Sequence, residues 1–346
     1  MLKLYTDQTF LIESHRKTVF PLLFDLYFLE DEELLEYYIL TSDISASDIV
    51  VFPIDYSLFV KFTKAFNNLR KLANKFNKPI WIYTAGDYGF TTYIKNCYTF
   101  RLGGFDNKLN SYTFIMPSFV NDPYLNVLSV GFSILKKENR PSIGFVGHAK
   151  PGFLKYLNEL LNYLKYKLRR TFNLILADSQ AFYPSSIKRA YLLHKLQISK
   201  SLNTNFILRN SYRAGVQNNA ERKISTLEFY NNIFNNAYTF CSRGVGNFSV
   251  RFYETLATGR IPILLNTDCR LPLNDLIDWS KHIVILDESK EDSLTNQILD
   301  FHDSKTIKEF EILQKSNREL WETHLNRPSF FIQIHHEFLK KLTTHG

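Results

Sequence analysis

One uninterrupted run, residues 238–265, constrains the fold of this chain more than any other part of its sequence. Two short apolar segments, 238–241 and 261–265, are typical of strands that are buried on both faces of a parallel sheet. Between them, a turn with Gly244 and Gly246 leads into a helical segment. Backbone N–H groups in such a turn can approach a ligand without a Cβ in the way, and a helix N-terminus attracts anions. The run therefore predicts a strand, a loop, a helix and a second strand around a phosphate-bearing ligand.

The helix in this run carries its own start and stop signals. Ser249 or Asn247 can cap it, and Gly259 is well placed to end it. Arg251 and Glu254 fall on one polar face, since residues three apart are neighbours on a helix. Their roles remain open at this point, because such a pair can bind a ligand or form a surface ion pair worth about 0.3–0.5 kcal/mol.

Charge and composition limit the classes of partner. A formal net charge of +8 favours an anionic partner, such as a nucleotide or an anionic membrane surface. Nucleic acid is not expected, because the basic residues are spread along the chain and no nucleic-acid-binding motif is present. The three cysteines show no disulfide or metal-ligand spacing, which favours a reducing compartment. With no apparent signal peptide or spanning segment, we expect a cytoplasmic protein with peripheral contact at the inner face of the membrane.

Strands and helices alternate along the rest of the chain, which predicts parallel α/β layers. The strand-like runs of the first part are residues 2–5, 37–40, 49–52, 79–83 and 112–116, and its long helical stretches are 18–36 and 56–77. A strand from residue 142 enters a turn with Gly147 and His148, where ligands bind in open α/β sheets. Further strands are expected at 172–177 and 206–209.

A basic amphipathic helix is predicted at residues 153–170. We expect its leucines to face inward and its lysines and arginines to face mostly solvent. A basic face of this kind is usually only solvated, and docking on a membrane is the alternative.

The residues in and around the glycine loop carry a resemblance to a known family. Cys241, Arg243 and Gly244 match a Cys-x-Arg-Gly motif, and residues 251–262 match Arg-Phe-x-Glu-x-Leu-Ala-x-Gly-x-Ile-Pro. A Leu-Pro pair and an Asp-Trp pair follow, the latter ending at Trp279. This pattern resembles the exostosin family of glycosyltransferases. The correspondence is close over 237–279 and looser over 205–215 and 318–331.

The resemblance implies a GT-B fold, in which two Rossmann-like doubly wound domains face a cleft and a last helix crosses back to the first domain. We therefore expect an acceptor-side domain at 1–138, a nucleotide-sugar-binding domain at 139–320 and a returning helix at 321–346. The implied activity is inverting transfer of a sugar from a nucleotide donor, with UDP expected, to a polysaccharide or lipid-linked glycan. A catalytically degenerate member that binds a glycan or a partner, or a nucleotide-sugar epimerase, is the alternative.

Glycosyl transfer requires charge stabilisation at the departing diphosphate. The sequence has no Asp-x-Asp motif, so neither a metal nor another cofactor is expected. Arg243 is the candidate for this role, because its fork matches phosphate oxygens; the alternative is an arginine that stiffens the loop. Glu254 is similar to the acidic residue that accepts hydrogen bonds from ribose hydroxyls in many GT-B enzymes.

The catalytic base is expected from the first domain. Asp87 is the candidate, in a glycine-flanked turn after residues 79–83, although an aspartate that only forms the turn is an equal alternative. Asp7 and Asp55 also follow strand-like runs and are further candidates. The expected donor-binding residues are Arg209, Arg213, Ser242, Arg243, Gly244, Val245, Gly246, Asn247, Ser249, Arg251, Glu254, Gly147 and His148.

Overall fold

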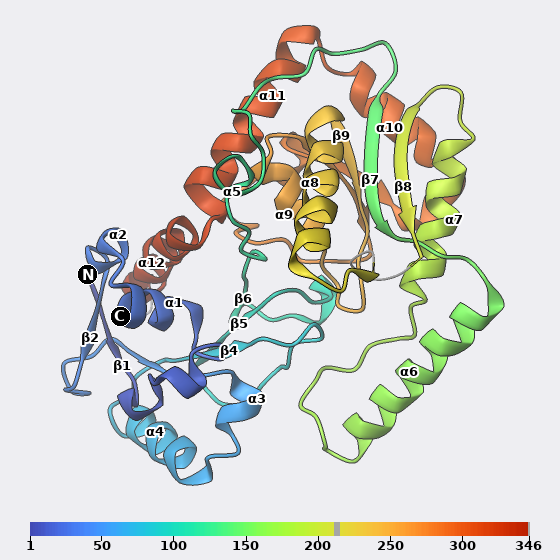
Figure 1. The fold of residues 1–346 in the computed structure, drawn as a ribbon. Helices are drawn as coiled ribbons and strands as arrows, with labels where there is room; N and C mark the ends of the chain where they lie inside the picture. The colour runs from blue at the N-terminus through green and yellow to red at the C-terminus, as the bar shows by residue number, and fades with distance from the viewer. Residues whose placement is uncertain (211–214, 345–346) are drawn as a thin grey trace.

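The amino-terminal part of the computed structural model, which describes residues 1–210 and 215–344, is built on a six-stranded parallel sheet (Figure 1). The strand order is β2-β1-β3-β4-β5-β6. The strands are β1 (Leu2–Tyr5), β2 (Tyr38–Thr41), β3 (Ile49–Val51), β4 (Ile80–Thr84), β5 (Cys97–Arg101) and β6 (Thr113–Ile115). The middle strands are buried on both faces, as their continuous apolar runs predict. Strand β5 was not expected from the sequence.

The two long helical stretches expected in this part are both interrupted. The first consists of α1 (Pro21–Phe24), a π turn (Asp25–Leu29) and α2 (Glu32–Leu35), because Glu30 adopts a left-handed conformation with φ +49°. The second consists of α3 (Tyr56–Phe59) and α4 (Thr63–Lys75). Phe62 leaves the helical region between them and packs edge-on against Phe10, with ring centroids 5.0 Å apart. Short α5 (Pro123–Asn126) follows the last strand.

The second sheet has five parallel strands in the order β11-β10-β9-β7-β8. They are β7 (Ser142–His148), β8 (Asn203–Arg209), β9 (Tyr238–Cys241), β10 (Ile261–Asn266) and β11 (Val284–Asp287). The chain starts at β7, adds β8 on one side and then places β9 on the other, so the strand order reverses at β7. In open α/β sheets, such a switch point lies beside the crevice that binds ligands.

Six helices described in this part flank or extend from the second sheet (Figure 1). They are α6 (Phe153–Thr171), α7 (Ser185–Gln197), α8 (Asn219–Asn235), α9 (Val250–Ala257), α10 (Leu294–Asp303) and α11 (Ile307–Leu320). Gly259, with φ +69°, follows the end of α9 as expected.

The strand expected at 172–177 is wrong. This segment turns at Asn173, with φ +54°, and leads to the amino-terminal domain, where Asp178 forms an ion pair with Arg101 at 2.6 Å. The strap formed by residues 172–184 therefore links α6 to the first domain.

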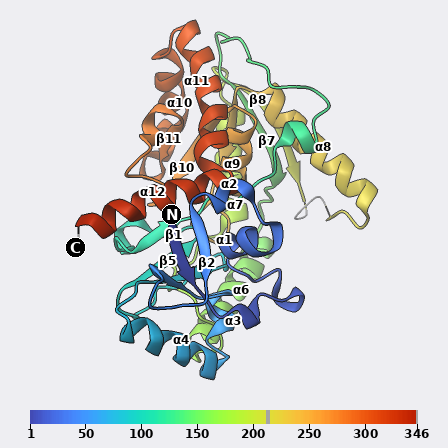
Figure 2. The same ribbon diagram turned by 90° about the vertical axis from the view of Figure 1, so that its left-hand side faces the viewer.

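The last helix, α12 (Arg327–Thr344), returns to the amino-terminal domain and lies beside β1 and α2 (Figure 2). The Tyr38 hydroxyl donates a hydrogen bond to the Phe331 carbonyl at 2.7 Å, and Phe338 packs edge-on against Trp81. Two parallel α/β domains with a returning helix confirm the expected fold class. The exact domain boundaries stay a prediction. None of the described helices has the length and apolar character needed to cross a bilayer.

Candidate functional site

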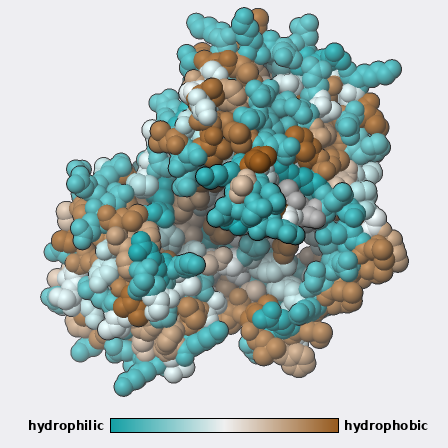
Figure 3. Space-filling model, in the orientation of Figure 1, coloured by the Kyte–Doolittle hydropathy of each residue, from teal (hydrophilic) through white to brown (hydrophobic). Residues whose placement is uncertain are grey.

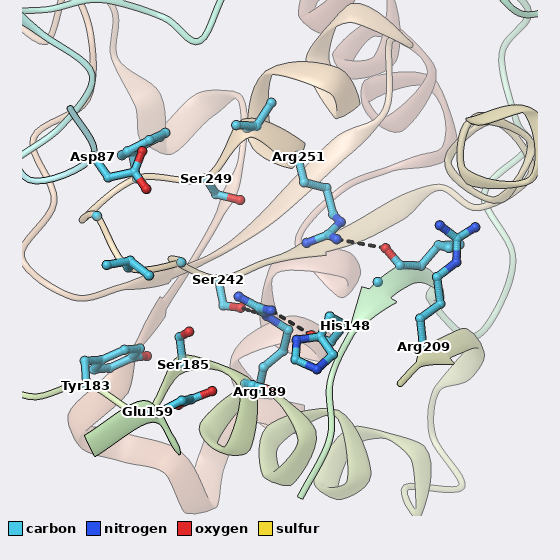
Figure 4. A pocket seen from close by; sticks show the side chains of 18 of the residues that line it. Asp87, His148, Glu159, Tyr183, Ser185, Arg189, Arg209, Ser242, Ser249 and Arg251 are labelled. Atoms are coloured by element: carbon cyan, nitrogen blue, oxygen red, sulfur yellow. Dashed lines mark hydrogen bonds between the residues drawn. The ribbon is translucent and has the colours of Figure 1, made fainter. Parts of the chain in front are cut away.

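A cavity of about 990 Å³ opens between the two domains, at the carboxyl ends of the second sheet's strands. The ends of β7 and β9 and the start of α9 form one side of it, and α6 and α7 contribute further walls. Asp87 and Tyr88 reach it from the loop after β4 of the first domain. Figure 4 shows side chains from both domains pointing into this space. The cavity lies at the switch point, where the strand order places a ligand site.

The glycine loop between β9 and α9 contacts the first domain closely at Gly246. A Cβ on Gly246 would lie 2.2 Å from the Asp87 carbonyl oxygen, so this position has room only for glycine. A Cβ on Gly244 would meet no atom within 4 Å. Both glycines and Val245 line the cavity, as expected. Glycine is therefore required at position 246 because the two domains pack closely there.

The start of α9 faces the cavity through Ser249 and Val250. Ser249 is the N-cap residue, but its side chain makes no capping hydrogen bond to the helix. The positive end of the helix dipole therefore points at the cavity without a side-chain acceptor on its N–H groups, an arrangement that suits an anion.

Arg251 and Glu254 lie one turn apart on α9, and both line the cavity. The Arg251 guanidinium donates to the Val146 carbonyl at 2.8 Å and lies over the Phe145 ring, 4.3 Å from its centroid. A surface ion pair between Arg251 and Glu254 is therefore not the arrangement found. A Cβ on Gly147 would lie 2.6 Å from this guanidinium, so Gly147 leaves the space that Arg251 fills.

Burial raises the pKa of the Glu254 carboxyl from 4.5 to about 7, although the positive charge of Arg251 opposes the change. The carboxyl group lacks the solvation that an ionised form needs. A ligand that donates hydrogen bonds to it would favour the ionised form. Hydroxyl groups are suitable donors for this purpose.

Arg189 of α7 is the main residue that the sequence analysis missed. Its three nitrogens donate to Ser242 Oγ at 2.9 Å, to the His148 carbonyl at 2.8 Å and to the Arg243 carbonyl at 2.9 Å. Arg189 thus joins the ends of β7 and β9 and lines the cavity between them (Figure 4).

The Arg189 side chain forms no ion pair with the described residues, although the charge of Glu159, which lines the same cavity, acts on it. Burial is the main cause that lowers the pKa of Arg189 to about 10, and the charge of Arg251 adds to the effect. Among the ion pairs of the described residues, none includes Arg189. A buried cation without a carboxylate partner is costly, and an anionic ligand would remove that cost. Arg189 is therefore a candidate anion-binding group in the cavity.

Arg243 lies in the glycine loop, and its guanidinium is held by protein groups. Its guanidinium donates to Gln180 Oε1 at 2.8 Å and to the Val245 carbonyl at 2.9 Å, and it lies between the rings of Tyr183 and Phe105. Its side chain is buried and is not among those that line the cavity. These contacts fit the alternative, an arginine that stiffens the glycine loop, and the phosphate contact stays a prediction.

Asn247 also has a structural position. Its side-chain amide donates to the carbonyls of Gly104, Thr267 and Asp268, and its Oδ1 accepts from the Thr267 hydroxyl at 2.5 Å. These bonds use the side chain away from the cavity. Asn247 therefore connects loops of the two domains, and its expected donor contact stays a prediction.

The other candidates on the second sheet lie at the cavity. Ser242, Gly147 and His148 line it, and burial together with nearby Lys155 and Arg189 lowers the pKa of His148. Arg209 also lines it, and it is held by an ion pair with Glu228. Arg213 lies outside the described residues.

Among the carboxylates proposed as the base, only Asp87 lines the cavity. Burial raises its pKa. Asp55 caps α3 and accepts a hydrogen bond from the Ala85 N–H at 2.7 Å, and Asp7 caps the short helix at Gln8–Phe10. Asp7 and Asp55 therefore have structural roles. Figure 4 shows Asp87 on the opposite side of the cavity from Arg189.

Two α/β domains with a cavity at the switch point define a GT-B type fold. Arg189 and Arg251 line this cavity, so its charge suits an anionic ligand. Residues 177–299 match the family model described as the Exostosin GT47 domain. This region is therefore similar to the Exostosin GT47 domain, in line with the resemblance seen in the sequence. It contains α7, the glycine loop and α9, and therefore both Arg189 and Arg251.

The chain is similar to a small part of longer relatives. It is 30% identical to Exostosin-1 of Bos taurus over 101 residues, which is 28% of this chain and 13% of that protein. It is 29% identical to Exostosin-1b of Danio rerio over 92 residues, or 25% of this chain and 12% of the relative. The match thus spans about an eighth of the length of these relatives.

Solved structures are similar at low sequence identity. A crystal structure of an alpha1,3-fucosyltransferase has 14% identity and a TM-score of 0.37, covering 92% of this chain and 82% of that chain. WaaG, a glycosyltransferase involved in lipopolysaccharide biosynthesis, has 9% identity and a TM-score of 0.34, covering 96% and 99%. The fold assignment rests on the strand order described above, since a similarity of this size carries no argument of its own.

Proposed function

We propose that this protein transfers a sugar from a nucleoside diphosphate donor, with UDP as the nucleotide, to a hydroxyl group of a glycan acceptor. The observation that supports this most strongly is Arg189, a partly buried cation that forms no ion pair and lies beside the glycine loop, in the region similar to the Exostosin GT47 domain. A diphosphate would supply the missing negative charge at the point where Arg189 and the start of α9 meet the cavity.

The same arrangement suggests a role for each side of the cavity. Glu254 would accept hydrogen bonds from the ribose hydroxyls, and Arg189 would offset charge on the departing diphosphate. The acceptor oxygen would attack the anomeric carbon on the face opposite the leaving group, as the carbon–oxygen bond to phosphate breaks. The proton of the acceptor hydroxyl would pass to Asp87, whose pKa is raised by burial. This order of events inverts the configuration at the anomeric carbon.

The proposal assigns no step to a metal ion, since the sequence lacks the paired aspartates that usually hold one against the diphosphate. Charge stabilisation comes from the guanidinium of Arg189 and from backbone N–H groups of α9.

Nucleotide binding tests the donor side. In a thermal-shift screen with EDTA present, UDP and UDP-sugars should raise the melting temperature more than GDP, CDP or CMP conjugates, because only the preferred ligand binds the folded state strongly. Incubation of the preferred donor with glycan acceptors should then release the free nucleotide. No shift with any nucleotide would contradict the proposal, and isomerisation of the donor without an acceptor would indicate an epimerase instead.

Donor affinity should depend on pH through Glu254. Ribose hydroxyls donate to the ionised carboxylate, whose pKa in the free protein is about 7. The dissociation constant for the donor should therefore fall about tenfold between about pH 6 and about pH 8, as the ionised fraction rises. Calorimetry at the two pH values measures this change.

The Glu254→Gln variant is the control for that experiment. It keeps the shape of the side chain and removes the titration, so its donor affinity should be weaker and nearly independent of pH. The free parent protein should also lose stability as pH rises from 4.5 to about 7, because the folded pKa is raised above that of the unfolded chain. An unchanged pH profile in Glu254→Gln would assign the titration to another group, such as His148.

A further inference from the structure

Helix α6 turns its apolar face to solvent. Phe153 and Leu154 are 73% and 76% exposed, and Leu161 and Leu168 are 62% and 58% exposed. These side chains share one side of the helix, because they recur at the spacing of its turns. Figure 3 shows hydrophobic residues gathered along the lower right edge of the molecule, where α6 lies in Figure 1. This is the reverse of the orientation expected from the sequence, in which the leucines face inward.

The polar side of α6 faces the protein and explains this orientation. Glu159, Asn162 and Tyr163 line the cavity between the domains. Tyr163 donates to the Gln180 carbonyl at 3.1 Å, and the ring of Tyr166 stacks on that of Tyr88 with centroids 4.2 Å apart. The polar and aromatic contacts thus hold the helix in place, and several of its leucines remain largely exposed among the described residues.

Basic residues flank the exposed leucines. Lys165, Lys167, Arg169 and Arg170 fall in the second half of the helix, and Glu159 is the only acidic residue from position 153 to position 174. Glu159 faces the cavity and pairs with Lys155, so it does not offset charge on the outer side. The outer side of α6 therefore combines an apolar stripe with a positive border.

We propose that α6 docks on the surface of a membrane that contains anionic phospholipids. A helix with exposed leucines and flanking lysines lies in the plane of such an interface, with its apolar side chains among the acyl chains and its cationic groups at the headgroups. Long basic side chains can follow the apolar surface and place their charges in the headgroup layer. The net charge of +8 supports the same attraction at longer range.

Charge also distinguishes a membrane from a second copy of the chain. Pairing of two α6 helices through their leucines would bring the basic borders of both helices together, with no acidic residue on either outer side to balance them. Like charges at close range oppose such an interface. An anionic surface covers the leucines and neutralises the border at the same time.

Docking through α6 would bring the cavity close to the bilayer, because the opposite side of the same helix lines that cavity. A helix with its side chains is about 10 Å in diameter, so only this width would separate the cavity from the headgroups. This consequence rests on the proposed function and favours an acceptor that is carried by a lipid. The docking itself requires neither a donor nor an acceptor.

Vesicle flotation tests the docking. The parent protein should float with vesicles of phosphatidylcholine and phosphatidylglycerol, and not with vesicles of phosphatidylcholine alone. The double variant Leu161→Gln/Leu168→Gln should bind the anionic vesicles at least about tenfold more weakly, because two leucines no longer leave water. Glutamine keeps a good helix propensity, so α6 itself should persist.

A matched control replaces two apolar side chains elsewhere that are at least as exposed, Leu125→Gln/Ile307→Gln, and should bind like the parent protein. Lys165→Gln/Lys167→Gln should weaken binding to anionic vesicles and reduce its dependence on salt. Equal binding of the parent protein to both kinds of vesicle, no binding to either, or a dimer in light scattering that disappears in Leu161→Gln/Leu168→Gln would each overturn the proposal.

Discussion

Replacing Arg189 with alanine should lower kcat/KM for the nucleotide-sugar donor by roughly 100- to 1000-fold, the usual effect of removing a group that stabilises charge on a leaving group. The guanidinium lies between the ends of β7 and β9, and no carboxylate of the described residues pairs with it. The UDP-induced rise in melting temperature should disappear in the same variant. Steady-state kinetics and thermal shift measure the two effects.

Three further variants separate this role from a structural one. Arg189→Lys keeps the positive charge but loses the planar guanidinium that bonds to the ends of β7 and β9. This variant should therefore retain part of the UDP-induced shift. Asp87→Asn should keep the shift and lose transfer, since the proposed base does not hold the donor. Arg70→Ala, at an exposed site, should behave like the parent protein. A normal UDP-induced shift in Arg189→Ala would place the diphosphate elsewhere.

The Arg243→Ala variant is informative for the same question. In the parent protein, the Arg243 guanidinium donates hydrogen bonds to Gln180 and to the Val245 carbonyl. Loss of these bonds should lower the melting temperature of the free protein. Arg243→Ala should lower kcat/KM for the donor less than Arg189→Ala does, once the folded fraction is taken into account.

Gly246→Ala should reduce transfer by roughly 5- to 150-fold, because overpacking at a tight contact costs about 1–3 kcal/mol. The added Cβ would lie 2.2 Å from the backbone oxygen of Asp87, and a backbone atom cannot swing aside as a flexible side chain can. The two domains must then separate at the point where Asp87 enters the cavity. Both kcat and the melting temperature of the free protein report this change.

Gly244→Ala is the matched control, two residues away in the same loop. Its Cβ would meet no protein atom within 4 Å, so the melting temperature of the free Gly244→Ala variant should stay near that of the parent protein. An equal fall in melting temperature in both variants would mean that loop flexibility, and not the contact with Asp87, is the cause.

The run 238–265 allowed the second sheet and its loop to be predicted from sequence, because apolar strands, glycines and a short amphipathic helix are local signals. The predicted strands at 238–241 and 261–265 are confirmed by β9 and β10. Arg189 gave no such signal. It meets His148 and Ser242 only after β7, α7 and β9 have packed together, so their spacing in the sequence carries no motif.

The periodic pattern of apolar residues in a helix does not tell whether its apolar side faces the protein or the solvent. The leucines of α6 predict one apolar side, and the structure confirms the helix, but the pattern alone does not tell which side meets the protein. Arg243 illustrates the same limit at a single residue. Its place in the glycine loop was predicted, whereas the direction of its side chain depends on Gln180, Tyr183 and Phe105, which arrive from distant parts of the chain.

Asp178, in the strap formed by residues 172–184, links α6 to the loop after β4. Its carboxylate accepts hydrogen bonds from the N–H and hydroxyl of Thr91 and from Arg101, while its carbonyl accepts one from the hydroxyl of Tyr166 on α6. A displacement of α6 would therefore pull on the same loop that carries Asp87. Through this one residue, the position of the outer helix and the position of the proposed base are mechanically coupled.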